Sequence, residues 1–151
     1  MDKRDTSMID VSGKKDTQRL ATAAASINMS RETLGLVLKN EIPKGNVLAV
    51  AQAAGIMAAK KTPDLIPLCH PLLLTNVSIV FGFPAKGGSI VITATVRGRG
   101  KTGFEMEALT AAAVAALTIY DMCKMFDQGM TITDMRLVKK TGGKSGTYTA
   151  K

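Results

Sequence analysis

The segment FEMEALTAAAVAALTIYDMCKMF, residues 104–126, constrains the architecture more than any other part of the chain. It is rich in helix-forming residues and apolar almost all round, so it predicts one long helix. A helix that is apolar on nearly every side must have most of its sides covered by other parts of the protein. We therefore expect this helix to lie in the core, packed against a sheet.

The segments on either side of this helix alternate apolar and polar residues, as β-strands do. Two strands are predicted over 77–83 and 90–96, with PAKGGS as the turn between them. A further strand is expected over 17–29, where small and larger side chains alternate, and a last one over 130–140. The four strands are enough for one antiparallel sheet.

Two more helices are predicted between the first and second strands. Ser30 can cap a short helix over 31–39, because its hydroxyl can accept from an unpaired helical N–H. Asn46 can cap a second helix, VLAVAQAAGIMAAKK, which we expect to end at its two lysines and Pro63. The order β-α-α-β-β-α-β indicates an α+β sandwich with the helices packed on one face of an antiparallel sheet.

Composition indicates one globular domain covering residues 1–151, with 46% hydrophobic and 21% charged residues. No apolar run approaches the roughly 18 to 20 residues that cross a bilayer, so no membrane partner is expected. The N-terminal segment MDKRDTSMIDVSGKKD is charged and has no signal-peptide core. We therefore expect a cytoplasmic protein.

The chain is strongly basic and has few groups that bind metals. Its formal charge is +8 and its pI about 9.7, which favours anionic partners such as nucleic acid or phosphorylated metabolites. Cys69 and Cys123 lack metal-ligand spacing, and His70 is the only histidine. We therefore predict neither a disulfide framework nor a zinc site.

Three glycine-rich segments are similar to phosphate-binding motifs. GRGKTG, residues 98–103, fits G-x-G-x-x-G, but the nearest acidic candidate for a ribose contact, Asp121, falls inside the long helix. GGKSG and RGKTG end like a P-loop, yet Val138 and Thr95 stand where its first glycine is required. These segments are either surface loops or simple anion sites built from backbone N–H groups and nearby cations.

Several charged residues stand in apolar surroundings. Glu105 and Glu107 begin the long helix, where acids suit the helix dipole or serve a site. Asp121 and Lys124 lie three apart, so they can pair, and their apolar neighbours indicate partial burial. His70, in PDLIPLCHPLLLT, is either a satisfied core histidine or a proton-exchanging group.

Helix geometry separates these residues. Glu107 and Asp121 are fourteen positions apart, or about 21 Å along the axis, and point to similar sides. A small substrate could hardly touch both within one chain. Either they contact different ends of a large ligand, or one site combines residues from two chains of a homo-oligomer.

Three segments together resemble the cyclic pyranopterin monophosphate synthase family of molybdenum cofactor (molybdopterin) biosynthesis. They are DLIPLCHPL, GKTGFEMEALTAAAVAALTIYDMCK and RLVKKTGGKSG, and the resemblance begins at IDVSGKKDTQR and spans essentially the whole chain. It implies a ferredoxin-like α+β subunit. It also implies a hexamer assembled as a trimer of dimers, with the active sites at the dimer interface.

The implied reaction converts 3′,8-cyclo-7,8-dihydro-GTP into cyclic pyranopterin monophosphate with release of pyrophosphate, so the enzyme would be a lyase acting on a nucleotide triphosphate. No cofactor or metal site is implied, and whether Mg²⁺ accompanies the triphosphate stays open. Catalytic roles are expected for Lys44, His70, Asp121 and Lys124. Substrate contacts are expected from Arg19, Cys69, His70, Arg97, Glu105, Met106, Glu107 and Lys140.

Two alternatives belong to other classes of protein. A small basic RNA-binding domain suits the charge, but single-strand binders usually present stacking aromatics, and only 4% of these residues are aromatic. An inactive assembly subunit is the other alternative, although such a protein would not need the acids and lysines described above. We therefore expect no nucleic-acid partner.

Overall fold

The structure, a computed structural model, describes residues 3–151 of the chain. Met1 and Asp2, which begin the predicted charged N-terminal segment, lie outside the described residues. The elements follow in the order β1 (Thr17–Asn28), α1 (Arg31–Leu38), α2 (Val47–Leu65), β2 (Leu73–Gly82), β3 (Ser89–Gly100), α3 (Glu105–Cys123), β4 (Thr131–Thr141) and β5 (Tyr148–Thr149).

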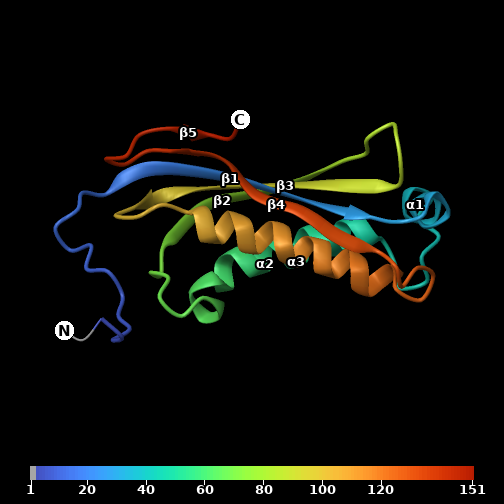
Figure 1. The fold of residues 1–151 in the computed structure, drawn as a ribbon, viewed down its shortest axis with the longest axis horizontal. Helices are drawn as coiled ribbons and strands as arrows, with labels where there is room; N and C mark the ends of the chain where they lie inside the picture. Colours follow the sequence, from blue (N-terminus) through green and yellow to red (C-terminus); the bar gives the residue numbers. More distant parts are fainter. Residues whose placement is uncertain (1–2) are drawn as a thin grey trace.

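The strands form one antiparallel sheet in the order β2-β3-β1-β4-β5. Figure 1 shows α2 and α3 side by side on one face of this sheet, with α1 beyond one of its ends. The four long strands with α2 and α3 have the β-α-β-β-α-β order of a ferredoxin-like fold. The predicted α+β class and element order are confirmed, and β5 is an addition to them.

Small side chains in β1 let the long helix come close to the sheet. Ala21, Ala23 and Ala25 alternate toward the helices and are fully buried, and β3 presents equally buried residues opposite them. From its own side, α3 contributes buried alanines at 108, 111, 112, 115 and 116. Packing of alanine on alanine brings backbone near backbone, which explains why so few aromatic residues are needed in this core.

The predicted end of α2 differs from the structure. Pro63 does not end α2, which continues to Leu65 with Pro63 in its last turn. The fixed φ of proline suits a helix, and so near the C-terminus its missing N–H removes only one intrahelical hydrogen bond. The Ser30 and Asn46 caps are confirmed, since their side chains accept from the N–H groups of Thr33 and Ala49.

Helix α3 is enclosed on most of its sides, as its composition predicts, and keeps one exposed edge. It is long and apolar enough to cross a membrane by length and composition, and half of that window is buried inside the protein. Its inner side packs against α2 and the sheet, as the core helix of a globular fold does. Within α3 the exposed residues are Met106, Leu117 and Asp121, with Leu117 57% exposed, and the rest are buried or partly buried, so the expected burial on most sides is confirmed.

Candidate active site

The first group of predicted site residues gathers where α3 begins. This N-end cluster consists of Cys69, His70, Glu105, Glu107 and Lys140. Lys140 comes from β4, on the side of the sheet that faces the helices, and its Nζ lies 2.9 Å from Glu105 Oε1. Cys69 and His70 come from the loop that follows α2. Residues that lie far apart in the sequence therefore meet at one end of one helix.

Glu107 is the buried carboxyl of this cluster. Its residue is 1% exposed, and Oε2 has no hydrogen-bond partner among the described residues. Oε1 accepts from the Cys69 thiol across 3.7 Å. Burial raises the pKa of the Glu107 carboxyl, because desolvation disfavours the charged form. Burial, and next the nearby Glu107, raise the pKa of the Cys69 thiol to about 11.

His70 lies in the wall of a cavity, so it is not a core histidine. Its Nε2 lies 2.7 Å from the backbone oxygen of Ile9, and that contact requires Nε2 to carry a proton and donate. The N-terminal segment thus lies against the N-end cluster. Together they enclose a cavity of about 350 Å³, whose walls include Ile9, Lys14, Cys69, His70, Glu105 and Met106.

The second group lies where α3 ends. This C-end cluster consists of Lys44, Asp121 and Lys124. Asp121 Oδ2 lies 3.1 Å from Lys44 Nζ, and Oδ1 lies 3.0 Å from Lys124 Nζ. Lys44 Nζ also donates to the Asp121 backbone oxygen. Hydrogen bonds from Lys124 and then Lys44 lower the pKa of the Asp121 carboxyl.

The predicted partial burial of the Asp121–Lys124 pair is wrong for the single chain. The side chains of Asp121 and Lys124 are 56% and 55% exposed. The apolar neighbours that suggested burial, Ile119, Met122 and Cys123, all turn inward, while the pair turns outward. A helix buries one side only, so charged residues can stand among apolar ones in sequence and still face solvent.

The two clusters do not meet within the chain. Glu107 and Asp121 both lie on α3, fourteen positions apart, which is about 21 Å of helix. Their differing exposure follows from what covers each end of the helix. The loop carrying Cys69 covers Glu107, whereas only the flexible Lys44 and Lys124 side chains reach Asp121 among the described residues.

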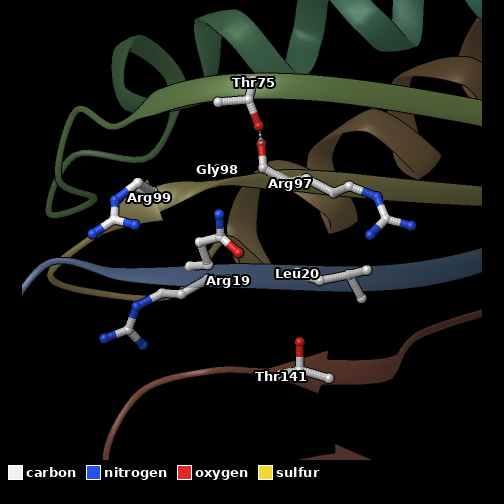
Figure 2. A pocket seen from close by; sticks show the side chains of 8 residues that line it. Arg19, Leu20, Thr75, Arg97, Gly98, Arg99 and Thr141 are labelled. Atoms are coloured by element: carbon white, nitrogen blue, oxygen red, sulfur yellow. Dashed lines mark hydrogen bonds between the residues drawn. The ribbon is translucent and has the colours of Figure 1, made fainter.

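Arg19 and Arg97 lie on opposite faces of the sheet. Arg19 pairs with Gly98 in the register of β1 and β3, and Leu20 pairs with Arg97, so the arginines are out of phase. Both reach the rim of a cavity of about 430 Å³ at the end of the sheet. Figure 2 shows the Arg97 side chain directed away from Arg19 and Arg99. The alternation of side chains along β1 already indicated which face Arg19 lies on. Arg19 is two positions from buried Ala21, so both side chains lie on the same face of the sheet.

Some residues at these cavities were missed by sequence reasoning. Ile9 contacts His70 through a backbone oxygen, which no side-chain pattern could reveal. Lys14 lines the cavity beside His70, and the basic pair in SGKKD was its only signal. Arg99, two residues after Arg97, lines the cavity at the end of the sheet.

The carboxylates do not fit a dedicated metal site. Within residues 3–151, no three side chains of histidine, cysteine, aspartate or glutamate come together as a metal-binding group. Asp121 is held by two lysines and Glu105 by Lys140, so their oxygens already have cationic partners.

The fold and the two clusters define a class: a ferredoxin-like α+β protein equipped for acid–base chemistry on an anionic small molecule. The particular family follows from comparison with known proteins. The chain belongs to the MoaC family, which it matches over residues 8–143.

Curated relatives are similar along nearly their whole length. Cyclic pyranopterin monophosphate synthase of Rhodospirillum rubrum is 57% identical over 143 residues, which cover 95% of this chain and 86% of the relative. The synthase of the same name from Geobacillus kaustophilus is 58% identical, covering 95% and 90%. That of Listeria monocytogenes serotype 4a is 56% identical, covering 99% and 92%. The predicted family is confirmed.

Proposed function

We propose that this protein is a cyclic pyranopterin monophosphate synthase. It converts 3′,8-cyclo-7,8-dihydro-GTP into cyclic pyranopterin monophosphate and releases pyrophosphate, as a lyase in an early step of molybdenum cofactor biosynthesis. The observation that carries this proposal is Asp121 between Lys44 and Lys124, in a chain about 57% identical to synthases of that name. The arrangement supplies proton carriers beside cations that attract phosphate.

The C-end cluster suits the proton transfers of the rearrangement. Converting a purine–ribose skeleton into a pterin requires protons to leave and join several atoms, and positioned lysines can carry them. Asp121 holds both ammonium groups close together and fixes their direction. Lys44 and Lys124 are the acid–base residues of the proposal, and Asp121 tunes both of them.

The N-end cluster suits recognition of the ring system. A buried carboxyl with a raised pKa can stay protonated and donate a hydrogen bond, as Glu107 does in the proposal. Because His70 Nε2 already donates to Ile9, Nδ1 is the nitrogen left for a ligand. His70 binds the ring or a phosphate and relays protons, while Cys69, Glu105 and Met106 line the same cavity and Lys140 pairs with Glu105.

A site shared between two chains reconciles the separated clusters. In the proposal, the N-end cluster of one chain faces the C-end cluster of its partner, so each dimer carries two complete sites. Exposed apolar residues such as Leu117 on the outer side of α3 support burial by another chain. The proposed assembly is a hexamer built as a trimer of dimers, in the cytoplasm.

Several cations are available for the triphosphate and for the departing pyrophosphate. Arginine binds phosphate through a bidentate fork and lysine as a point charge. Charge accumulates on the leaving group as the cyclic phosphate closes, and fixed cations lower that barrier. The candidates in the proposal are Arg19, Lys44, Arg97, Lys124 and Lys140.

The test is turnover of the cyclised dihydro-GTP intermediate by the purified protein, with pterin formation and pyrophosphate release followed together. We expect turnover by the wild type and by Lys61→Ala, whose lysine lies in an exposed pair with Asp64. Folded Lys44→Ala should show none. Turnover by Lys44→Ala would remove that residue from the mechanism, and unchanged turnover by His70→Ala would remove His70.

A wild type without turnover, with assembly and substrate verified, would contradict the proposed function. Steeply salt-dependent binding of arbitrary RNA in that case would favour the RNA-binding alternative.

A further inference from the structure

A segment without helix or strand, residues 7–14, lies over the cavity of the N-end cluster, and we call it the covering segment. Figure 1 shows the chain before β1 next to the loop that follows α2, which carries His70. Four residues of the covering segment form one wall of the cavity: Ser7, Ile9, Val11 and Lys14. The segment therefore contacts His70 and also faces any ligand in the cavity.

Apolar packing does not hold the covering segment in place. Val11 is its only partly buried residue, and Ile9 is 74% exposed. Residues this exposed gain little from the hydrophobic effect, so polar contacts must fix the position of the segment. Among the described residues, two hydrogen bonds join it to the rest of the protein, one from His70 and one from Lys101.

The two hydrogen bonds reach carbonyl groups three positions apart on the covering segment. His70 Nε2 lies 2.7 Å from the Ile9 oxygen, and Lys101 Nζ donates to the Ser12 oxygen across 3.2 Å. Lys101 belongs to the connection between β3 and α3, which leads directly into Glu105 of the N-end cluster. The connection that begins α3 thus also anchors the segment whose carbonyl accepts the His70 proton.

The chain between these two contacts is folded into turns. The Ser12 N–H donates to Asp10 Oδ1 across 2.8 Å, which makes an Asx-turn. The Lys14 N–H donates to the Val11 oxygen across 3.0 Å and closes a second turn. Hydrogen bonds from Ser12 lower the pKa of the Asp10 carboxyl, and the nearby charge of Lys101 lowers it further. Because the turns leave the chain little freedom, the position of the Ser12 carbonyl determines that of the Ile9 carbonyl.

The Ile9 carbonyl determines how the His70 ring is oriented. In a histidine, the hydrogen bond made by one ring nitrogen sets the protonation and direction of the other. A carbonyl oxygen only accepts, so this contact keeps a proton on Nε2 and leaves Nδ1 for a ligand. Without the contact, the ring is free to turn about its side-chain bonds.

We propose that Lys101 and Asp10 are positioning residues that orient the His70 ring through the covering segment. Lys101 fixes the Ser12 carbonyl, and the turn made by Asp10 carries this constraint to the carbonyl that holds the Nε2 proton. The inference rests on the proposed function for the benefit of the orientation, since a proton relay requires Nδ1 to face the ligand. Neither positioning residue has to contact the substrate.

The Nε2 proton of His70 reports the contact directly. A ¹⁵N-labelled protein without a histidine tag has a single imidazole, so its ring signals are assigned at once. A hydrogen-bonded ring proton is observed by NMR, whereas exchange with water removes the signal of a free one. We expect the Nε2–H signal in the wild type, its loss in Lys101→Ala, and its return in Lys101→Arg, which restores a donor. Lys86→Ala removes an exposed lysine between β2 and β3 and should keep the signal.

A second pair of variants disrupts the turn and leaves every lysine in place. Asp10→Ala removes the acceptor of the Ser12 N–H and should lose the signal, whereas Asp10→Asn keeps an acceptor oxygen and should retain it. Gly13→Ala is the matched control within the covering segment, because a Cβ there would meet nothing within 4 Å. A signal that persists in both Lys101→Ala and Asp10→Ala, or that is missing from the wild type, would overturn the proposal.

Turnover separates positioning from direct contact with the substrate. Lys101→Ala and Asp10→Ala should each lower kcat about tenfold or more, because a misplaced group reacts slowly, while KM for the cyclised intermediate changes less. Lys101→Arg and Asp10→Asn should recover most of the lost kcat. A fall in kcat in Lys101→Ala with the Nε2–H signal intact would overturn a role that acts through His70.

The failure of this inference is distinguishable from that of the proposed function. Full turnover by variants that have lost the Nε2–H signal would overturn the positioning role alone. A wild type without turnover, whose signal still depends on Lys101 and Asp10, would contradict the proposed reaction and support the orienting contact.

Discussion

Lys44 Nζ and Asp121 Oδ2 lie 3.1 Å apart, although 77 positions separate the two residues in the chain. The loop before α2 thus meets the last turn of α3 through one ion pair. Lys124 holds the other oxygen of the same carboxylate. An exposed ion pair contributes little to stability, so this arrangement is better explained by chemistry than by folding.

The first prediction concerns the shared carboxylate. Asp121→Asn should lower kcat by about 100-fold or more, because the two lysines lose the group that orients and tunes them. The denaturation midpoint should barely change, since the side chains are exposed. Asp64→Asn is the matched control, because Asp64 also pairs with a lysine three positions away on an exposed helix surface. Equal kcat values for the two variants would contradict the assignment.

The second prediction concerns the buried carboxyl of Glu107. A raised folded-state pKa means that the folded protein binds the proton more tightly than the unfolded chain. The contribution of Glu107 to stability is therefore fully present below the unfolded pKa and is lost as pH rises through the folded value. Glu107→Gln removes this loss, so it should raise the free energy of unfolding at pH 8 by roughly 1–3 kcal/mol, the cost of an unsatisfied buried group.

Urea unfolding at pH 8 and pH 4 checks this sign. The stability difference between Glu107→Gln and wild type should shrink toward pH 4, where Glu107 is protonated in both states. Glu105→Gln serves as a control, since it breaks the Lys140 pair and should not stabilise the protein at pH 8. A Glu107→Gln protein that is no more stable than wild type at pH 8 would contradict a raised pKa of the buried Glu107 carboxyl.

The third prediction concerns the Cys69 thiol. Its pKa of about 11 means that little thiolate exists at pH 8, so alkylation by iodoacetamide should be slow and should accelerate up to about pH 11. Cys123 is fully buried in the core, so mass spectrometry of the peptides should assign the early reaction to Cys69. Glu107→Gln should shift the profile to lower pH, because it removes the carboxylate whose charge helps to raise the pKa of the Cys69 thiol. If alkylation of Cys69 in the folded wild type is instead centred near pH 8.5, the usual pKa of a free thiol, the burial of this thiol beside Glu107 would be contradicted.

The fourth prediction concerns the contact between α2 and α3. A Cβ on Gly55 would lie 2.2 Å from Ile79 Cδ1 and 3.0 Å from the Ala111 oxygen. Gly55→Ala should therefore cost roughly 1–3 kcal/mol of stability through overpacking. Gly35→Ala, in α1 with open space around it, should stabilise the protein by roughly 0.5–1 kcal/mol through helix propensity. Thermal unfolding of both variants distinguishes packing from propensity, and effects of the same sign would contradict this account.

Alternation and helix capping were enough to predict most of the fold. Ala21 and Val96 mark the inner faces of their strands, and the Ser30 and Asn46 side chains start their helices where expected. Pro63 was misjudged because a proline near a helix end costs too little to stop it. The two residues of β5 are too few for a periodic signal.

The candidate site was predictable by residue type but not by arrangement. Burial of Asp121 was misjudged because local sequence does not reveal which side of a helix end another segment covers. The contact between Ile9 and His70 runs through a backbone oxygen, so no residue pattern predicts it. In contrast, the 21 Å between Glu107 and Asp121 followed from helix rise alone, and it led to the shared-site proposal.

Complementation between two inactive variants tests the shared site most directly. His70→Ala removes a residue of the N-end cluster, and Lys44→Ala removes one of the C-end cluster. If each site combines the two clusters from different chains, a mixed dimer has one intact site and one doubly altered site. Co-refolding equal amounts of both inactive proteins should then restore about a quarter of wild-type turnover, because half of the dimers are mixed. Mixed dimers shown to form, yet without turnover above that of either parent, would contradict an active site built from two chains.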